Sequence, residues 1–244
     1  MRYRVALTDP RQHPPDPALL DLLHRCDAFL DARDCPRRED VITLCAGADA
    51  ILVAGTPLDG YAISSLQNCR AIVRTGTGYD NIDVEAAARA RIPVSNVPEL
   101  CTDDVADHTL AMLLACARRL FEGDRGIRAS VWNPLYLMPV GRLGGQVLGL
   151  VGFGKIGQAV ARRAIAFGLS LIYYDPFRQE APRGLQAAAC ESVDQLLFQA
   201  DYVSVHVPLT KQTRGMLAMP QFQRMKRTSI LINCARVKLL MSLT

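Results

Sequence analysis

The stretch VLGLVGFGKIGQAVARRAIAFGLSLIYYD, residues 147–175, decides the fold of this chain. It opens with a short apolar run, which predicts a buried strand. The sequence then reads G-x-G-x-x-G over residues 152–157, and apolar side chains follow every three or four residues as far as Gly168, which predicts a helix. A second apolar run over residues 169–174 ends at Asp175. The order strand, glycine turn, helix, strand and acid indicates a βαβ unit.

The three glycines have different tasks in a turn that binds a dinucleotide. Gly152 permits the tight turn, Gly154 lets the backbone approach a pyrophosphate, and Gly157 lets the helix pack close to the strand. The N–H groups and the dipole at the start of the helix favour phosphate. Asp175 is placed to accept hydrogen bonds from ribose hydroxyls and would repel the 2′-phosphate of NADP, so we expect NAD. The alternative is a βαβ unit whose glycines are incidental.

The composition argues against several classes of protein. Half of the 244 residues are hydrophobic and 21% are charged, which suits a folded chain with a sizeable core. The net charge of +4 is modest and the arginine pairs are scattered, so we expect no nucleic-acid partner. No apolar run approaches the roughly 20 residues of a membrane span, and we expect no membrane partner. Eight dispersed cysteines without a C-x-x-C motif indicate a reducing, cytoplasmic location.

A first domain is expected over residues 1–97, where apolar strands alternate with helical patterns. The strands are expected at residues 3–7, 50–54, 71–74 and 93–97, and the helices at residues 18–30 and 83–91. Such alternation predicts an α/β domain with a parallel sheet.

A second domain is expected from Pro98 to the end of the chain, residues 98–244. Thr102 begins a helix that is predicted to continue to about Leu120. Residues 125–142 are expected to be irregular, with Trp132 as a packing anchor. Beyond the βαβ unit, further strands are expected at residues 202–207 and 229–233.

Five segments follow one another as they do in the D-isomer-specific 2-hydroxyacid dehydrogenases, a family that the chain resembles. They lie at residues 73–84, 96–119, 152–175, 203–213 and 232–236, and include RTGTGYDNID, VADHT and INCAR. The first two of these motifs are most similar to the phosphoglycerate-dehydrogenase-like and C-terminal-binding-protein branches. The resemblance implies a smaller, flavodoxin-like substrate domain (residues 1–97) and a Rossmann-type NAD-binding domain (residues 98–244).

The resemblance also implies the reaction, a hydride transfer between NAD(H) and a small 2-hydroxy or 2-keto acid. Arg236 matches the arginine that grips the substrate carboxylate, and a planar guanidinium suits that task because it forms two parallel bonds. The loop formed by Thr75, Gly76, Thr77 and Gly78 matches the one whose backbone amides face the carboxylate. The alternatives are a surface arginine and an ordinary strand–helix turn.

The remaining cofactor contacts are also implied by the resemblance. They are Thr109, Lys155, Ile156, His206, Val207, Pro208, Cys234, Ala235 and again Arg236. His206 is expected to line the nicotinamide pocket and is not the acid–base histidine of the family, whereas His108 is expected to be a packing residue. The resemblance implies a homodimer when the protein is complete, with the helix from Thr102 in the contact. No metal is expected.

The sequence departs from the family after Arg236, where it reads VKLLMSLT. The glutamate and the acid–base histidine of the family have no counterparts, so we expect an incomplete member that lacks C-terminal elements of both domains and has impaired turnover. Val237 is expected to be strained if the loop requires a positive φ at that position. The alternative function is a non-catalytic, NAD-responsive binding protein similar to the corepressor branch.

Overall fold

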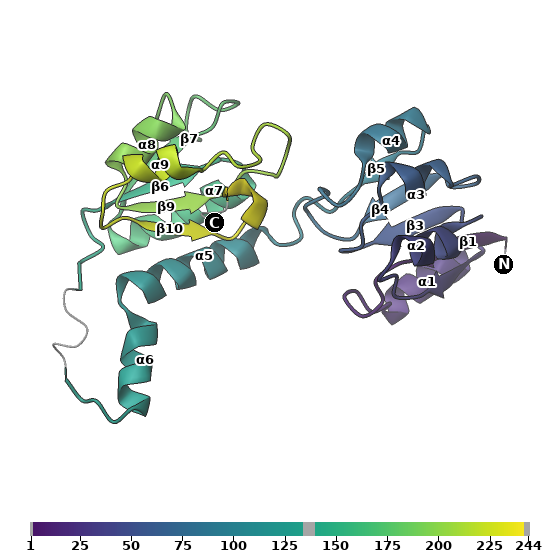
Figure 1. The fold of residues 1–244 in the computed structure, drawn as a ribbon, viewed down its shortest axis with the longest axis horizontal. Helices are drawn as coiled ribbons and strands as arrows, with labels where there is room; N and C mark the ends of the chain where they lie inside the picture. The colour runs from purple at the N-terminus through teal and green to yellow at the C-terminus, as the bar shows by residue number, and fades with distance from the viewer. Residues whose placement is uncertain (1, 134–139, 242–244) are drawn as a thin grey trace. The chain divides into compact units, whose positions relative to one another are not determined.

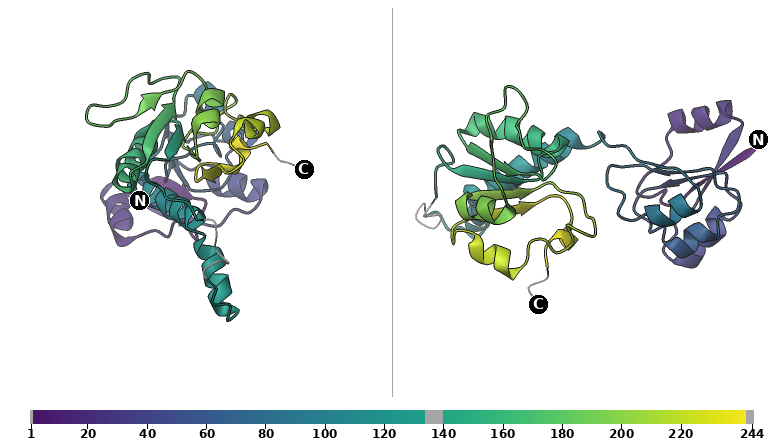
Figure 2. Two further views of the ribbon diagram at one scale, coloured as in Figure 1. Left: turned by 90° about the vertical axis from the view of Figure 1, so that its left-hand side faces the viewer. Right: turned by 90° about the horizontal axis from the view of Figure 1, so that it is seen from above.

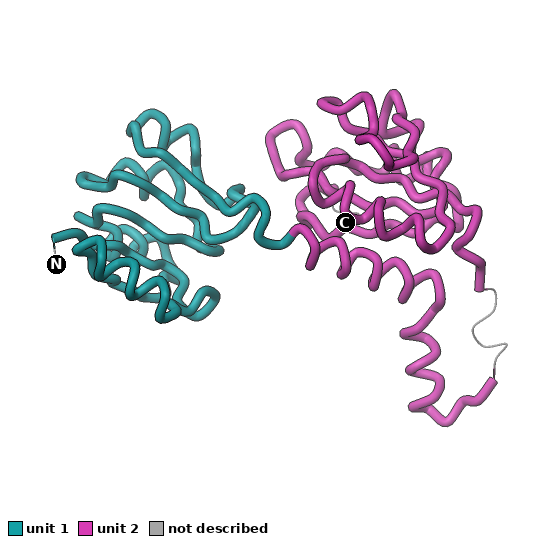
Figure 3. Tube along the Cα trace, turned by 180° about the vertical axis from the view of Figure 1, so that it is seen from behind, with its two compact units in different colours: residues 1–101 teal, residues 102–244 magenta. Residues whose placement is uncertain are grey.

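The computed structural model describes residues 2–133 and 140–241 and divides the chain into two compact units, Met1–Cys101 and Thr102–Thr244. Figure 3 colours the two units separately. Each unit contains one five-stranded sheet in which all strands run parallel. The predicted α/β class is therefore confirmed, and the division between the units lies close to the predicted boundary at Pro98.

Unit 1 has the strand order β2-β1-β3-β4-β5. Its strands are β1 Tyr3–Leu7, β2 Ala28–Ala32, β3 Ala50–Val53, β4 Ala71–Arg74 and β5 Val94–Ser95, and its helices are α1 Pro17–Arg25, α2 Arg38–Cys45, α3 Gly60–Ser64 and α4 Val84–Arg89. Helices α2, α3 and α4 bury apolar side chains against one face of the sheet, and α1 lies over β2 on the other face (Figures 1 and 2). The centre of this core is formed by Ile51, Val53 and Ile72, all with 0% exposure.

Four elements of unit 1 differ from the prediction: α1 is shorter than expected, and β2, α2 and α3 were not expected. The helix expected over residues 18–30 ends at Arg25, and the chain turns through Asp27, whose φ is 55°. Aspartate tolerates this left-handed conformation better than most residues, so a tight turn separates α1 from β2. Helices α2 and α3 were also not predicted, although both bury side chains of their own, Val41 and Leu44 in α2 and Ile63 in α3.

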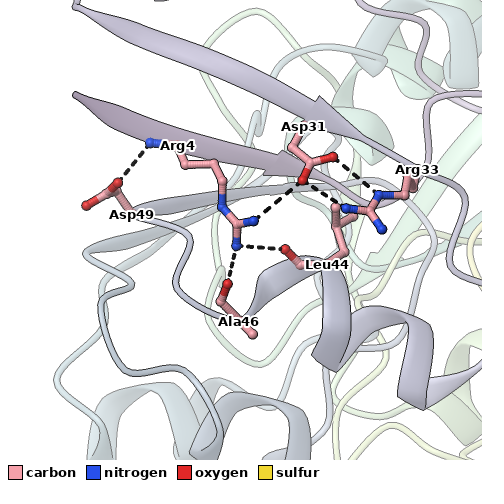
Figure 4. Close-up of polar contacts among 6 residues, drawn as sticks. All are labelled: Arg4, Asp31, Arg33, Leu44, Ala46 and Asp49. Carbon is pink, nitrogen blue, oxygen red and sulfur yellow. Dashed lines mark hydrogen bonds and ion pairs between the residues drawn. The ribbon is translucent and has the colours of Figure 1, made fainter. Parts of the chain in front are cut away.

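A polar cluster ties the strands of unit 1 to the end of α2 (Figure 4). The Arg4 guanidinium donates to the carbonyl oxygens of Leu44 (3.2 Å) and Ala46, which lie at the carboxyl end of α2. It also forms an ion pair with Asp31 at 3.5 Å, and Asp31 is paired with Arg33 at 3.1 Å. A cation at a helix carboxyl end satisfies carbonyl groups that the helix itself leaves unpaired.

Unit 2 has the strand order β10-β9-β6-β7-β8. Its strands are β6 Val147–Val151, β7 Ser170–Tyr174, β8 Ala188–Ala189, β9 Tyr202–Val205 and β10 Ile230–Asn233, and its helices are α5 Thr102–Ala117, α6 Leu120–Arg128, α7 Lys155–Ala164, α8 Val193–Gln199 and α9 Met219–Arg224. The predicted βαβ unit is confirmed as β6, α7 and β7. A 3₁₀ turn, η2 (Ile165–Phe167), extends α7 as far as Gly168, whose φ of 72° ends the helix as a left-handed residue.

Helices α5 and α7 cover one face of the sheet in unit 2, and α8 and α9 cover the other (Figures 1 and 2). Leu113 of α5 and Val160 of α7 are fully buried in the first of these layers. Arg163 of α7 pairs with Asp103 at 2.9 Å and with Asp107 at 2.5 Å, both on α5. Apolar burial and these ion pairs together fix α7, and with it the glycine turn, against α5.

Several predictions for unit 2 are wrong. The helix predicted from Thr102 is present as α5, but it ends at Ala117. Arg119 then has a left-handed φ of 53°, and α6 occupies part of the stretch that was wrongly expected to be irregular. Trp132 is 88% exposed and anchors no packing, and His108 is exposed as well. Val237 has no positive φ, because it begins a 3₁₀ turn, η3 (Val237–Leu239), so the expected strain is absent there. Residues 134–139 of the stretch expected to be irregular lie outside the described residues.

Within residues 2–133 and 140–241, no helix is both long and apolar enough to cross a membrane. The same residues contain no group of three or more His, Cys, Asp or Glu side chains suited to hold a metal ion. All eight cysteines are free thiols.

Candidate functional site

The sheet of unit 2 has a switch point between β6 and β9. From β6 the chain adds β7 and β8 on one side, and it then returns to add β9 and β10 on the other. In open parallel sheets, ligands bind at the carboxyl ends of the strands at such a point. Gly152 follows β6 and His206 follows β9, and His206 N–H donates to the carbonyl oxygen of Val151 at 2.7 Å. The glycine turn and the segment from His206 therefore lie side by side.

The three glycines differ in what surrounds them. Gly152 has a φ of +94°, and a Cβ on it would lie 2.8 Å from the carbonyl carbon and oxygen of His206. A Cβ on Gly157 would overlap the carbonyl oxygen of Gly152. A Cβ on Gly154 would meet no atom of the neighbouring described chain within 4 Å, and Gly154 offers no side chain to cap α7. The first and third glycines thus allow close packing, and the second leaves open space at the amino end of a ten-residue helix, which fits a pyrophosphate.

Asp175 lies beside this turn. Its Oδ2 accepts a hydrogen bond from the Phe153 amide at 2.8 Å, and its Oδ1 accepts one from the Phe177 amide at 2.9 Å. Each carboxylate oxygen has a further lone pair that can accept a hydroxyl. The carboxylate predicted to bind ribose is therefore held against the glycine turn, at the carboxyl end of β7.

His206 is held neutral by its surroundings. Its Nε2 lies 2.8 Å from Ser204 Oγ, and burial lowers the pKa of the imidazole to about 4. A neutral imidazole suits a pocket that holds an uncharged or cationic ring. Thr109 is fully buried on α5, and its hydroxyl donates to the carbonyl oxygen of Val105 at 2.7 Å, so its contact with a cofactor stays a prediction.

The segment Cys234-Ala235-Arg236 follows β10, which pairs in parallel with β9. All three residues are half-buried, and Arg236 Nη1 donates to the carbonyl oxygen of Ala235 at 3.1 Å. The carboxyl ends of β10, β9, β6 and β7 therefore carry, in this order, Arg236, His206, the glycine turn and Asp175 along one edge of one sheet.

Comparison with known proteins decides the family. Residues 110–242, more than half of the chain, match the D-isomer specific 2-hydroxyacid dehydrogenase, NAD binding domain. The chain is 39% identical to glyoxylate reductase of Korarchaeum cryptofilum over 208 residues, which cover 83% of this chain and 62% of that protein. It is 36% identical to glyoxylate reductase of Thermococcus litoralis over 247 residues, covering 97% of this chain and 73% of that protein. The chain belongs to the D-isomer specific 2-hydroxyacid dehydrogenase family.

Solved structures of the family agree with this assignment. The D-lactate dehydrogenase of Aquifex aeolicus, complexed with NAD and lactic acid, has a TM-score of 0.86 and 26% sequence identity, over 97% of this chain and 70% of that one. Unit 2 is thus the NAD-binding domain of the family, and NAD is its cofactor. The relatives are reductases and dehydrogenases, which favours the oxidoreductase over the corepressor-like alternative. The chain spans less than two thirds of the Korarchaeum relative.

In unit 1, the segment that the family resemblance assigns to the substrate is a loop after β4 that several hydrogen bonds fix in place. Thr75 N–H donates to the carbonyl oxygen of Val53 at 2.9 Å, and Thr77 Oγ1 donates to that of Val97 at 3.0 Å. Asn96 Nδ2 donates to the carbonyl oxygen of Thr77 at 2.7 Å. The loop from Thr75 to Gly78 is therefore fixed from both neighbouring strand ends, at the carboxyl edge of its sheet.

The sequence prediction missed Arg74, the last residue of β4. Its guanidinium is half-buried and lies so close over Gly76 that a Cβ there would overlap Nη1. Its Nε is buried and has no hydrogen-bond partner among the residues that the structure describes. A buried N–H donor of a charged group costs free energy when it lacks a hydrogen-bond acceptor, and a bound anion would supply that acceptor. An arginine directly before a glycine loop was the available signal, but its lack of a partner is visible only in the fold.

Proposed function

We propose that this chain is an NAD-dependent oxidoreductase acting on a small 2-hydroxy or 2-keto acid. The observation that carries the proposal is the switch point of unit 2, where the open space at Gly154 and the carboxylate of Asp175 lie along the same sheet edge as Arg236. A dinucleotide and a carboxylate could bind there next to each other. NAD, when bound, would supply or accept the hydride, and the hydroxyl proton would exchange with solvent water, because we assign no acid–base group among the described residues to it.

Each residue of the site has a proposed task. The amino end of α7 at Gly154 binds the pyrophosphate, and Asp175 binds the adenosine ribose. His206, neutral because its pKa is lowered to about 4, lines the nicotinamide ring, and we assign it no acid–base role. Arg236 binds the substrate carboxylate through two parallel hydrogen bonds. The other proposed cofactor contacts are Thr109, Lys155, Ile156, Val207, Pro208, Cys234 and Ala235.

We assign substrate binding to unit 1 through the loop Thr75–Gly78 and through Arg74. The glycines allow a carboxylate to approach the backbone amides. The unpaired Nε of Arg74 supports a second anion contact at the same loop, because a bound anion would complete its hydrogen bonding.

The proposed oligomer is a homodimer, and α6 supports it. Only Gly126 of this helix is buried, whereas Leu120, Phe121 and Ile127 are each more than half exposed. Figure 1 shows α6 bending away from the end of α5. Its first half is acidic and its second half basic, so two antiparallel copies have complementary charges across a twofold axis. Light scattering of Phe121→Glu tests this: we expect a dimer that dissociates in the variant, and a monomeric parent chain would refute it.

We propose the cytoplasm as the location. All eight cysteines are free thiols, although several lie partly exposed. Free thiols persist in reducing compartments, whereas oxidising compartments favour disulfides.

The proposed function is tested by NADH titration and by NADH oxidation with glyoxylate, pyruvate, hydroxypyruvate and phosphohydroxypyruvate. Arg236→Gln is the informative variant. Arg227→Gln is the matched control, because Arg227 is exposed and lies before the amino end of β10, whereas Arg236 follows its carboxyl end. We expect Arg236→Gln to lower kcat/KM by at least about 30-fold, equivalent to about 2 kcal/mol for a charge pair that loses one partner. A chain that binds no NADH, or equal effects of the two variants, would refute the proposal.

A further inference from the structure

Asn233, the last residue of β10, uses both ends of its side-chain amide. Its Nδ2 donates to the carbonyl oxygen of Arg236 at 2.9 Å, and its Oδ1 accepts from the Ala235 amide at 3.1 Å. The main chain of Asn233 pairs with Val205 of β9, so the residue is itself fixed in the sheet. One half-buried side chain thereby closes the loop that carries the predicted substrate arginine.

The other side of this loop is anchored as well. The carbonyl oxygen of Arg236 also accepts from the Leu239 amide at 3.2 Å, and Leu239 is fully buried. The segment after Arg236 is bonded to a second part of the chain, because Gly215 N–H donates to Lys238 O at 3.0 Å and Leu217 N–H donates to Leu239 O at 3.2 Å. Arg236 itself has an extended backbone, with φ −141° and ψ 135°, between the two anchors.

The chemistry of this contact requires an amide. A donor must face the carbonyl oxygen of Arg236 while an acceptor faces the N–H of Ala235, and the asparagine side chain supplies both. An ionised aspartate has only acceptors, so one of its oxygens would lie against the carbonyl oxygen of Arg236. Alanine supplies neither group and leaves the loop without its inner anchor.

We propose that Asn233 is a positioning residue for Arg236: it sets the backbone from which the guanidinium reaches the substrate carboxylate. This inference rests on the proposed role of Arg236. A displacement of about 1 Å in a group that positions a substrate can lower the reaction rate on the order of 100-fold. We therefore expect loss of Asn233 to weaken carboxylate binding about 10- to 100-fold. NADH affinity should fall less, because the proposed contacts at Gly154 and Asp175 lie outside this loop.

The test measures binding of oxamate, an unreactive 2-keto acid analogue, to the full chain saturated with NADH, followed by NADH fluorescence. The variants are Asn233→Ala and Asn233→Asp. Arg236→Gln removes the guanidinium itself and shows the effect of losing it directly. Asn68→Ala is the matched control, because Asn68 is an exposed asparagine in unit 1. NADH affinity is measured separately for each variant.

The outcomes separate the inference from the proposed function. Weaker oxamate binding in Arg236→Gln and in both Asn233 variants, with NADH binding kept, supports the inference. Weaker binding in Arg236→Gln alone overturns it and leaves the proposed function intact. No oxamate response in the parent chain, or none lost in Arg236→Gln, refutes the proposed function and the inference with it. Loss of NADH binding in both Asn233 variants also overturns the inference, because Asn233 would then support the whole domain.

A second readout follows Arg236 directly. Phenylglyoxal modifies arginine side chains, and mass spectrometry of the digested protein measures how far oxamate protects Arg236. We expect protection in the parent chain and in Asn68→Ala, and its loss in Asn233→Ala. Undiminished protection of Arg236 in Asn233→Ala would overturn the inference even if other properties changed.

Discussion

Substitutions at the three glycines of the turn after β6 should affect protein stability and cofactor binding to different degrees. Gly152→Ala places a residue with a Cβ at φ +94°, which costs about 1–3 kcal/mol in backbone strain. The new Cβ would also lie 2.8 Å from the main chain of His206, and main chain cannot move aside as a side-chain tip can. We expect the free energy of unfolding to fall by at least about 3 kcal/mol, within the range of severe single substitutions.

Gly157→Ala should have two opposing effects on the free energy of unfolding. Alanine is favoured over glycine inside a helix by about 1 kcal/mol. The added Cβ, however, would overlap the carbonyl oxygen of Gly152, so α7 has to move away from the turn. Overpacking of this kind costs about 1–3 kcal/mol, so we expect a net loss of stability in spite of the better helix propensity.

Gly154→Ala should behave in the opposite way. Its φ is −72°, and a Cβ there meets no neighbouring atom within 4 Å, so stability should fall by no more than about 1 kcal/mol, the cost of a poorer cap. The methyl group instead enters the space proposed for the pyrophosphate. We expect NADH binding to weaken about 10- to 100-fold, which corresponds to about 1–3 kcal/mol of overpacking.

Calorimetric melting and NADH fluorescence titration of the three variants test this reasoning. At about 2–4 °C per kcal/mol, Gly152→Ala should lower the melting temperature of unit 2 by roughly 6–12 °C, and Gly154→Ala by only a few degrees. A Gly154→Ala variant that melts as early as Gly152→Ala, yet binds NADH normally, would refute the division of tasks between these glycines.

Three further predictions concern the charges of unit 2. Asp175→Asn should reduce the preference for NADH over NADPH in parallel titrations, and an unchanged preference would show that another group selects the cofactor. Burial alone would raise the pKa of Asp201, but hydrogen bonds from Lys226 Nζ (2.7 Å) and the Val147 amide (2.9 Å) lower it overall. Because its folded-state pKa is depressed, Asp201 should stabilise the protein at neutral pH and lose that effect as the pH falls below about 4. The melting temperature of Asp201→Asn should therefore depend less on acid pH than that of the parent chain. An equal dependence in both would contradict this. Arg163→Met should lower the free energy of unfolding by about 1 kcal/mol in urea, since exposed ion pairs contribute little each, and a loss well above that would mean that the pairs with α5 act cooperatively.

The sequence predicted those parts of the fold in which local pattern and tertiary structure agree. The run from Val147 to Asp175 contains two continuous apolar runs and, between them, apolar side chains every three or four residues, and the structure places β6, α7 and β7 close to the predicted boundaries. Strand β2 was missed because its neighbour α1 has a strong helical pattern, and the turn at Asp27 that separates them is a backbone conformation with no fixed sequence signal.

The misses at the site have a different cause. A predicted packing role for Trp132 failed because burial depends on which segments meet in space, and α6 leads the chain away from the core. The lowered pKa of His206 and the unpaired Nε of Arg74 are likewise properties of the surroundings that the fold creates. The resemblance to family motifs identified the candidate residues that follow strands. The contacts of Asn233 and the surroundings of Arg74 became visible only in the structure.

The order of the strands in unit 2 also ranks its parts by how easily they open. β6 lies at the centre of the sheet and carries the glycine turn, whereas β10 lies at an edge and carries Arg236. Edge elements have fewer neighbours and exchange their amide hydrogens through local opening before central ones do. A momentary detachment of β10 would therefore displace Arg236 while the dinucleotide turn persists, so the amides of β10 should exchange their hydrogens faster than those of β6.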